Sequence, residues 1–242
     1  MKKIITTIVF LFFVFNTFAQ TTTLTFNSSG GITNSTLILT TVTSGWHSFH
    51  ISLFTATELN NLKGNIEEIR WYKYADAAYT SNDAILRIYF KHTTKSIVPS
   101  DNNAYFNELS GATLVYQNLG QNIDQAEGWK SFPFSTNFSY NGTDNLMILV
   151  YFYYPSSLST GLHFNWRYST ISSQSSSWSS DNASSITLSA TGTDYRPWTQ
   201  MVIDTTATVG VLEQKLSEYN YEIYPNPFTN SATIEIYNSQ FS

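Results

Sequence analysis

Short runs of β-branched and aromatic residues recur between Gln20 and Asp204, separated by Gly, Asn, Asp and Ser. Runs of this length, bounded by turn residues, are typical of strands in an all-β protein. The expected strands are Thr23–Phe26, Thr36–Val42, His47–Phe54, Ile66–Tyr74, Ala84–His92, Thr113–Gln117, Trp129–Phe134, Leu146–Tyr154, His163–Ser169, Ser185–Ser189 and Trp198–Ile203. So many short strands in one segment predict a jelly-roll-like antiparallel β-sandwich over residues 20–204.

One segment carries a helical signal. In Thr55-Ala-Thr-Glu58, the Thr55 hydroxyl and the Glu58 carboxylate can each satisfy the other residue's backbone amide. Apolar residues follow, and Gly64 ends the pattern. The sequence therefore predicts a short surface helix or turn after the third expected strand.

Composition excludes several classes of protein. The chain is 42% hydrophobic and only 12% charged, it has a formal net charge of −5, and it contains no cysteine. Disordered and nucleic-acid-binding chains have fewer aromatic residues or many more basic ones. Without cysteine there is no disulfide framework, thiol nucleophile or Cys-type zinc site, so stability has to come from an apolar core.

The N-terminus has the pattern of an export signal. Lys2 and Lys3 precede an apolar run from Ile4 to Phe18, and Thr17-Phe18-Ala19 offers a small-x-small cleavage site. A membrane anchor is the alternative, but a span needs about 20 apolar residues. We therefore expect residues 1–19 to be a signal peptide, with no membrane span after its removal. Removal makes the chain more negative, which disfavours nucleic acid and other polyanions as partners.

A second module is expected at the C-terminus. A passage without aromatic residues, from Asp204 to Leu216, predicts a linker over residues 205–218. Pro225 and Pro227 then disfavour helix, and Ala232–Tyr237 alternates like a half-buried strand. Residues 219–242 are therefore expected to begin a β-module.

The segment Ile223-Tyr-Pro-Asn-Pro-Phe-Thr-Asn-Ser-Ala-Thr-Ile-Glu-Ile236 resembles the opening of the C-terminal (Por-type) sorting domain of type IX secretion cargo in the Bacteroidota. Because the chain stops at Ser242 after one expected strand, residues 219–242 are expected to be an N-terminal fragment of such a domain. The resemblance implies export by the type IX secretion machinery, and a location outside the cell or on the outer-membrane surface.

Roughly residues 45–204 also resemble a β-sandwich module found in type IX secreted surface proteins. The resemblance is carried, in order, by Leu53–Asn60, Gly64–Tyr72, Leu86–Lys95, Gly128–Phe134, Phe138–Val150 and Tyr195–Trp198. It implies a non-catalytic accessory or adhesin-like unit, and it offers no catalytic residue to carry over.

Asn141-Gly142 leads through Thr143 into an expected buried strand. Gly142 supplies the positive φ of a tight turn, so turn chemistry is the favoured interpretation. The alternative is a structural calcium site with Asn141, Asp144 and Asn145 as oxygen ligands. No other cofactor or metal is expected.

The sequence offers little for catalysis. Residues at odd spacing on a strand point to opposite faces, which separates His47 from His50 and Glu67 from Glu68. One of the two glutamates is expected to pair with Arg70 or Lys63. Paired-histidine metal motifs and a G-x-S-x-G elbow are missing from the sequence. A hydrolase whose site residues meet only in space stays open as the last alternative.

The remaining candidate is an aromatic platform for sugars. Trp178 lies in a serine-rich polar stretch, which would suit an exposed ring, although a core position is almost equally expected. The candidate ligand-binding residues are Trp178, Asp181, Asn182, Tyr195, Arg196 and Trp198. The tryptophans expected in the core are Trp46, Trp71, Trp129 and Trp166, because each lies in or beside an expected strand.

Adhesion or binding of a polysaccharide or surface glycoprotein is therefore the function that the sequence favours. A structural spacer within a larger secreted protein is the alternative. It predicts that changes at Trp178 and Trp198 alter only stability.

Overall fold

A computed structural model describes residues 20–28, 30–33, 37, 45–99, 101, 103–155, 164–180, 189–191, 194–205, 219–224 and 233–238. The chain divides into two compact units, Met1–Thr206 and Ala207–Ser242. This division falls beside the expected end of the sandwich module at residue 204. The expected signal peptide, and all of the expected linker except Thr205, lie outside the described residues.

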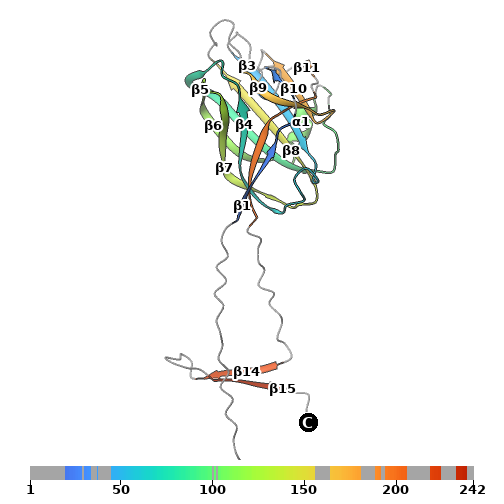
Figure 1. The fold of residues 1–242 in the computed structure, drawn as a ribbon, viewed down its shortest axis with the longest axis vertical. Helices are drawn as coiled ribbons and strands as arrows, with labels where there is room; N and C mark the ends of the chain where they lie inside the picture. The colour runs from blue at the N-terminus through green and yellow to red at the C-terminus, as the bar shows by residue number, and fades with distance from the viewer. Residues whose placement is uncertain are drawn as a thin grey trace, which may run out of the picture. The chain divides into compact units, whose positions relative to one another are not determined.

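The described residues of the first unit are mostly in β-strands (Figure 1). Its strands are β1 (Thr21–Phe26), β2 (Ile32–Thr33), β3 (Trp46–Phe54), β4 (Gly64–Lys73), β5 (Tyr79–Thr93), β6 (Thr113–Ile123), β7 (Gly128–Tyr140), β8 (Asn145–Tyr154), β9 (Trp166–Thr170), β10 (Ser175–Ser180), β11 (Ser189–Thr191), β12 (Tyr195–Pro197) and β13 (Thr199–Asp204). The single helix of the described residues is α1 (Ala104–Leu109).

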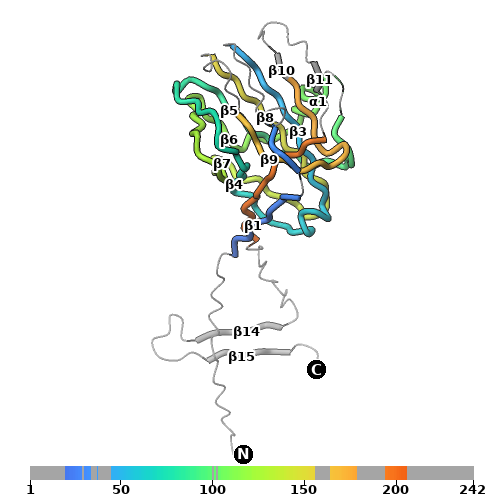
Figure 2. The backbone as a smooth tube through the Cα atoms, turned by 45° about the horizontal axis from the view of Figure 1, so that its top comes forward, coloured from blue at the N-terminus to red at the C-terminus, as the bar shows by residue number. Residues whose placement is uncertain are grey.

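These strands form two antiparallel sheets (Figure 2). The seven-stranded sheet has the order β1-β13-β4-β9-β12, with β7 beside β4 and β2 beside β9. The six-stranded sheet has the order β11-β10-β3-β8-β5-β6. The chain passes from one sheet to the other at most connections, including those from β3 to β4, from β4 to β5, from β6 to β7 and from β7 to β8. Such crossing is typical of a jelly-roll-like sandwich, and it confirms the predicted fold class.

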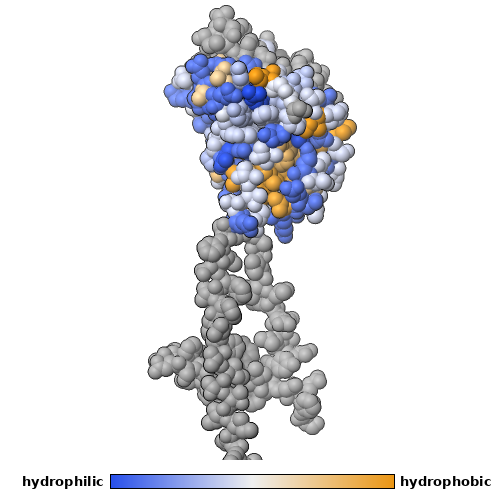
Figure 3. All heavy atoms as spheres, in the orientation of Figure 1, coloured by the Kyte–Doolittle hydropathy of each residue, from blue (hydrophilic) through white to orange (hydrophobic). Residues whose placement is uncertain are grey.

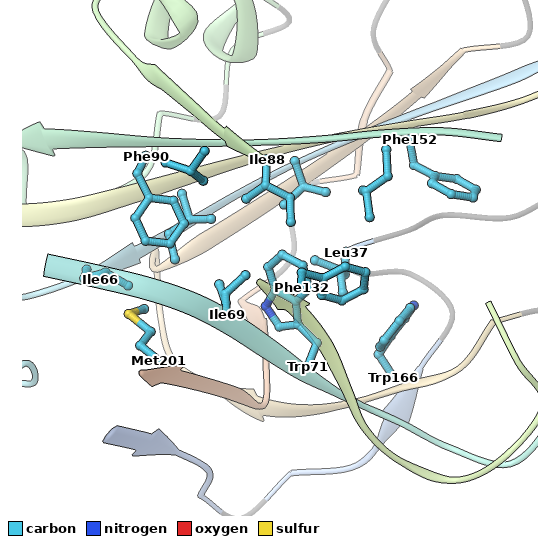
Figure 4. Close-up of a cluster of buried hydrophobic side chains, with 14 of the residues drawn as sticks. Leu37, Ile66, Ile69, Trp71, Ile88, Phe90, Phe132, Phe152, Trp166 and Met201 are labelled. Atoms are coloured by element: carbon cyan, nitrogen blue, oxygen red, sulfur yellow. The ribbon is translucent and has the colours of Figure 1, made fainter. Parts of the chain in front are cut away.

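The main core lies between the two sheets (Figure 4). Strand β4 contributes Ile69 and Trp71, while the facing strand β5 contributes Ile88 and Phe90. All four side chains are at most 2% exposed. Because side chains alternate along a strand, the residues between them point away from this core. This alternation places Tyr72 of β4 on the outer face of the seven-stranded sheet.

A second apolar cluster covers part of the outer face of the six-stranded sheet. Phe49 of β3 packs there with Tyr105 of α1, whose ring centroid lies 4.9 Å away. The segment carrying α1 is held by Glu108, which forms ion pairs with Lys91 and Lys95. Burial of apolar area in this cluster therefore fixes a short helix that has no side-chain cap.

The inner side of β3 is unusually polar for a sandwich. His50 is fully buried, and its Nδ1 and Nε2 atoms each lie 2.7 Å from a serine hydroxyl, those of Ser177 and Ser52. Each ring nitrogen thus has a partner, which offsets the cost of burying the imidazole. Burial lowers the pKa of His50 from 6.5 to about 3, so the ring is neutral.

Most predicted strands are confirmed, but several boundaries differ. β5, β6 and β7 extend well beyond the predicted ends because long antiparallel pairings hold them. The serine-rich segment Ser175–Ser180, which was not among the expected strands, is strand β10 paired with β3. The predicted strand at 36–42 lies outside the described residues apart from Leu37, and 185–189 apart from Ser189.

The predicted capping box after β3 is confirmed as a turn. The Thr55 amide donates to Glu58 Oε2 at 2.8 Å, and the Glu58 amide donates to Thr55 Oγ1 at 3.2 Å.

The face of the sandwich in Figure 3 is mostly hydrophilic, with apolar residues gathered in limited groups.

The second unit contains one antiparallel pair of strands, β14 (Tyr219–Tyr224) and β15 (Thr233–Asn238). Ile223 is paired with Ile234. The predicted strand at 232–237 thus coincides with β15, and it has a partner strand that the sequence did not suggest.

Candidate functional site

Partly exposed aromatic side chains gather on the outer face of the seven-stranded sheet. We call the group formed by Tyr72, Tyr74, Trp129, Arg167 and Trp198 the outer aromatic surface. Tyr72 of β4 is paired across the ladder with Trp129 of β7, and their rings meet edge to face at 5.3 Å. Trp198, between β12 and β13, lies on the other side of Tyr72 at 5.7 Å. Three neighbouring backbones therefore bring these rings into one row.

Arg167 of β9 organises this row electrostatically. Its guanidinium carbon lies 5.7 Å from the ring centroid of Tyr72, 5.7 Å from that of Tyr74 and 5.4 Å from that of Trp198. Cations at this distance from aromatic faces are attracted by the ring quadrupole. Arg167 also lies 3.4 Å from Glu127, so its charge is balanced on the protein itself.

Glu127 connects the arginine to the tyrosine. The Tyr72 hydroxyl donates to Glu127 Oε1 at 3.1 Å. Burial raises the pKa of Tyr72, the nearby carboxylate raises it further, and Arg167 opposes the shift. The phenol is therefore protonated at neutral pH, and the surface presents hydroxyl and guanidinium groups around apolar ring faces. The indole nitrogen of Trp198 is buried and has no hydrogen-bond partner among the described residues.

A hollow of about 210 Å³ adjoins the outer aromatic surface at Trp129. It lies between the end of β6 and the start of β7 and is lined by Gln121, Asn122, Ile123, Asp124, Trp129, Lys130, Ser131 and Phe132. Pockets for drug-sized molecules usually enclose about 300–1,000 Å³. This hollow is smaller and mainly polar, so it suits one end or one unit of a larger ligand rather than an enclosed small molecule.

The residues predicted to bind a ligand do not form one site. Trp198 belongs to the outer aromatic surface. Tyr195 is half-buried, and its ring lies 4.2 Å from that of Tyr168. Trp178 lies on the opposite sheet, and Asp181 and Asn182 lie outside the described residues.

Trp178 does not present a ring to solvent. It lies on β10 with 0% exposure, inside the second apolar cluster beside Phe49. The serines that precede it on β10 gave no apolar pattern in the sequence, yet Ser175, Ser176 and Ser177 are buried too, in the strand that pairs with β3. The expectation of an exposed Trp178 is therefore wrong, and the alternative core position is correct.

Arg196 is also buried, at 3% exposure. Its guanidinium donates to Glu58 Oε1 at 2.6 Å and to the Leu53 carbonyl at 2.8 Å, and it stacks on Phe54 at 4.3 Å. These contacts occupy its donors within the protein. Arg196 therefore fastens the turn after β3 to the other sheet, and this geometry leaves little of it for a ligand.

Trp71 and Trp166 are core residues as predicted, at 2% and 0% exposure. Trp46 and Trp129 are instead partly buried. The position of Trp129 could have been found from spacing, because it lies three residues before the buried Phe132 and so faces the other side of β7.

The turn before β8 uses its polar oxygens internally. Asn141 Oδ1 accepts from the amides of Thr143 and Asp144, and Asn145 Oδ1 accepts from the Ala56 amide. Gly142 has φ of 78°, as the turn interpretation predicts. These bonds favour turn chemistry over calcium binding. Within the described ranges, there is no group of three or more His, Asp or Glu side chains placed to hold a metal ion.

The histidines that the structure describes are held apart. His47 lies on the outer side of β3 against Tyr153, whereas His50 lies on the inner side, as their spacing predicts. His92 accepts from the Asn141 amide at 3.2 Å, and His163 lies outside the described residues. Glu68 pairs with Arg70, which confirms the predicted ion pair, while Glu67 accepts from Asn137. The expectation that the two glutamates point to opposite faces is wrong. A bulge between Ile66 and Glu68 interrupts the alternation, so that Ile66 and Ile69 both lie in the core and both glutamates bond to side chains of β7.

No protein-family model and no curated protein matches the chain. Among solved structures, a chain in the structure of infectious bursal disease virus Gt strain is similar at 10% identity, over 79% of this chain and 35% of that chain, with a TM-score of 0.19. This chain thus spans about a third of the viral chain, and we draw no conclusion from so distant a similarity. In the part of the chain that the structure describes, no helix has the length and apolar character needed to cross a bilayer.

Proposed function

We propose that this protein is a secreted or cell-surface, non-catalytic β-sandwich that binds carbohydrate through its outer aromatic surface. The observation that carries the proposal is the row of Trp198, Tyr72 and Trp129 beside Arg167. Aromatic faces pack against the apolar faces of sugar rings, and the neighbouring polar groups bind hydroxyls. Adhesion to a polysaccharide or surface glycoprotein is the biological role that follows.

Rigidity supports this assignment. The three aromatic residues lie on or beside strands β4, β7 and β13, and the backbone amide of Tyr72 donates to the Trp198 carbonyl at 3.2 Å. A binding site on paired strands loses little conformational entropy when a ligand arrives. The surface is therefore organised before binding.

The proposed location rests on the two ends of the chain. The signal-peptide pattern at residues 1–19 and the resemblance of Ile223–Ile236 to a type IX sorting domain support export by that secretion machinery. A protein outside the cell meets polysaccharides and glycoproteins, which agrees with the chemistry of the outer aromatic surface.

The test is affinity electrophoresis of the chain through a panel of polysaccharides and mucins. Trp129→Ala and Tyr72→Ala remove rings from the outer aromatic surface, and Ile97→Ala is the matched control because Ile97 is an exposed apolar side chain (59%) elsewhere. We expect at least one glycan to retard the chain and the control equally. Each ring variant should bind about tenfold more weakly, which corresponds to about 1.4 kcal/mol.

Two results would count against the proposal. If no glycan retards the chain, a spacer or a protein-binding adhesin becomes the better account. If a glycan retards both ring variants as strongly as the control, carbohydrate binds elsewhere on the protein.

A further inference from the structure

We infer that the site takes a neutral glycan chain, several sugar units long, that runs across the strands from Trp198 to the hollow beside Trp129. This inference rests on the proposed function and names its ligand class. It follows from two features of the described residues, the charge balance around the outer aromatic surface and the continuity of that surface with the hollow.

Three ion pairs lie around the outer aromatic surface and the hollow. Arg167 lies beside Glu127, Arg70 is bonded to Glu68 at 2.7 Å, and Lys130 is bonded to Asp124. Partner hydrogen bonds lower the pKa of Glu68 and of Asp124, so both carboxylates stay ionised when paired. Three cations and three anions therefore cancel, and an acidic glycan would have to displace a carboxylate to reach any of these basic groups.

The polar groups of the hollow also suit hydroxyls. Gln121 and Asn122 line it together with the Lys130 and Asp124 pair. Both amides are already bonded within the protein, Gln121 to Tyr116 and to the Asn122 carbonyl, and Asn122 to Asn82. An amide has two donor hydrogens and two acceptor lone pairs, so each side chain keeps a second donor and a second acceptor position for a sugar hydroxyl. Phe132, only 3% exposed, contributes an apolar wall. A neutral sugar unit satisfies this mixture without leaving a buried charge unpaired.

The length of the site exceeds one sugar ring. Trp198 lies next to β13, Tyr72 is on β4 and Trp129 is on β7, and these three strands are consecutive in the sheet. Two strand spacings cover about 10 Å, since neighbouring strands lie about 4.8 Å apart. The hollow between β6 and β7 is lined by Trp129 as well, so the row and the hollow share this residue. A single sugar can contact only part of this row, so affinity should rise with chain length.

The experiment compares polymers in affinity electrophoresis of the full chain. Neutral gels contain dextran, laminarin, galactomannan or hydroxyethylcellulose, and acidic gels contain alginate, polygalacturonate or carboxymethylcellulose. Each gel is run at about 20 mM and about 500 mM salt, which shortens the screening length several-fold. We expect retardation by a neutral polymer, unchanged by salt, and about 100-fold weaker competition by its free monosaccharide.

Arg70→Gln tests the charge argument directly, because Arg70 belongs to these ion pairs but lies outside the aromatic row and the lining of the hollow. A neutral ligand should lose less than about threefold in affinity, because its binding does not use the arginine charge. Retardation only by acidic polymers, with loss at high salt or in Arg70→Gln, would overturn the inference and leave carbohydrate binding intact. Equal competition by the monosaccharide would overturn the extended site. Failure of every polymer would instead refute the proposed function itself.

Discussion

Acidification should destabilise this protein through the buried His50. Its pKa falls from 6.5 to about 3 on folding because the imidazole is desolvated between the sheets. A base whose pKa is lower in the folded state binds more protons in the unfolded state, so protons favour unfolding. The free energy of unfolding is therefore highest above about pH 6.5 and falls progressively as the pH falls toward about 3. Between pH 7 and pH 5 this shift lowers the free energy of unfolding by about 2 kcal/mol, at about 1.36 kcal/mol per pKa unit. Burial also lowers the pKa of His47 and of His92, which adds loss in the same direction.

Urea unfolding at a series of pH values measures this loss, with His50→Asn as the matched variant because an amide can still bond to the flanking serines. Between pH 7 and pH 5 the free energy of unfolding of the variant should fall less than that of the natural chain. The difference between the two losses should be most of the 2 kcal/mol. An NMR titration of the His50 ring provides a control that does not depend on the variant's folding. A ring that titrates near pH 6.5 in the native protein would refute the reasoning.

Three further predictions concern residues whose structural roles are now defined. Trp178→Ala should lower the free energy of unfolding by about 3–5 kcal/mol, because it leaves a large cavity in the core. Glycan retardation of the folded variant should stay unchanged. Loss of retardation in a folded variant would show that Trp178 belongs to the binding site. Arg196→Met should lower the free energy of unfolding, measured with urea, by about 3 kcal/mol, because Glu58 loses its ion-pair partner. An unchanged free energy of unfolding would mean that water replaces the guanidinium. Gly142→Ala should lower stability by about 1–2 kcal/mol, because φ is 78° and the new Cβ would lie 2.9 Å from the Asn61 carbonyl; an unchanged melting temperature would contradict this.

The sandwich could be predicted from the sequence because its central strands alternate strongly. In β4, Ile69, Trp71 and the buried Lys73 share one face, and the strand pattern was evident before the structure. β10 could not be predicted in this way. Ser175, Ser176 and Ser177 are buried beside β3, a partner more than a hundred residues earlier, and the local sequence shows only a polar stretch.

The candidate site was predicted only in part for the same reason. Trp198 was identified, but its partners Tyr72 and Trp129 belong to strands distant in sequence, and only the sheet order brings them together. Arg196 looked available for a ligand because its partner Glu58 lies more than a hundred residues away. Spacing could have placed Trp129 on the outer face, whereas no local signal could have paired Arg196 with Glu58.

The central claim is that a glycan binds on the outer aromatic surface of the seven-stranded sheet. The most direct measurement is NMR of the indole N–H signals of the six tryptophans during titration with a polysaccharide fragment that retards the chain. The account predicts that the signals of Trp129 and Trp198 shift, while those of the core residues Trp71, Trp166 and Trp178 stay in place. Saturable shifts confined to the core tryptophans or to Trp46, with Trp129 and Trp198 unchanged, would contradict it.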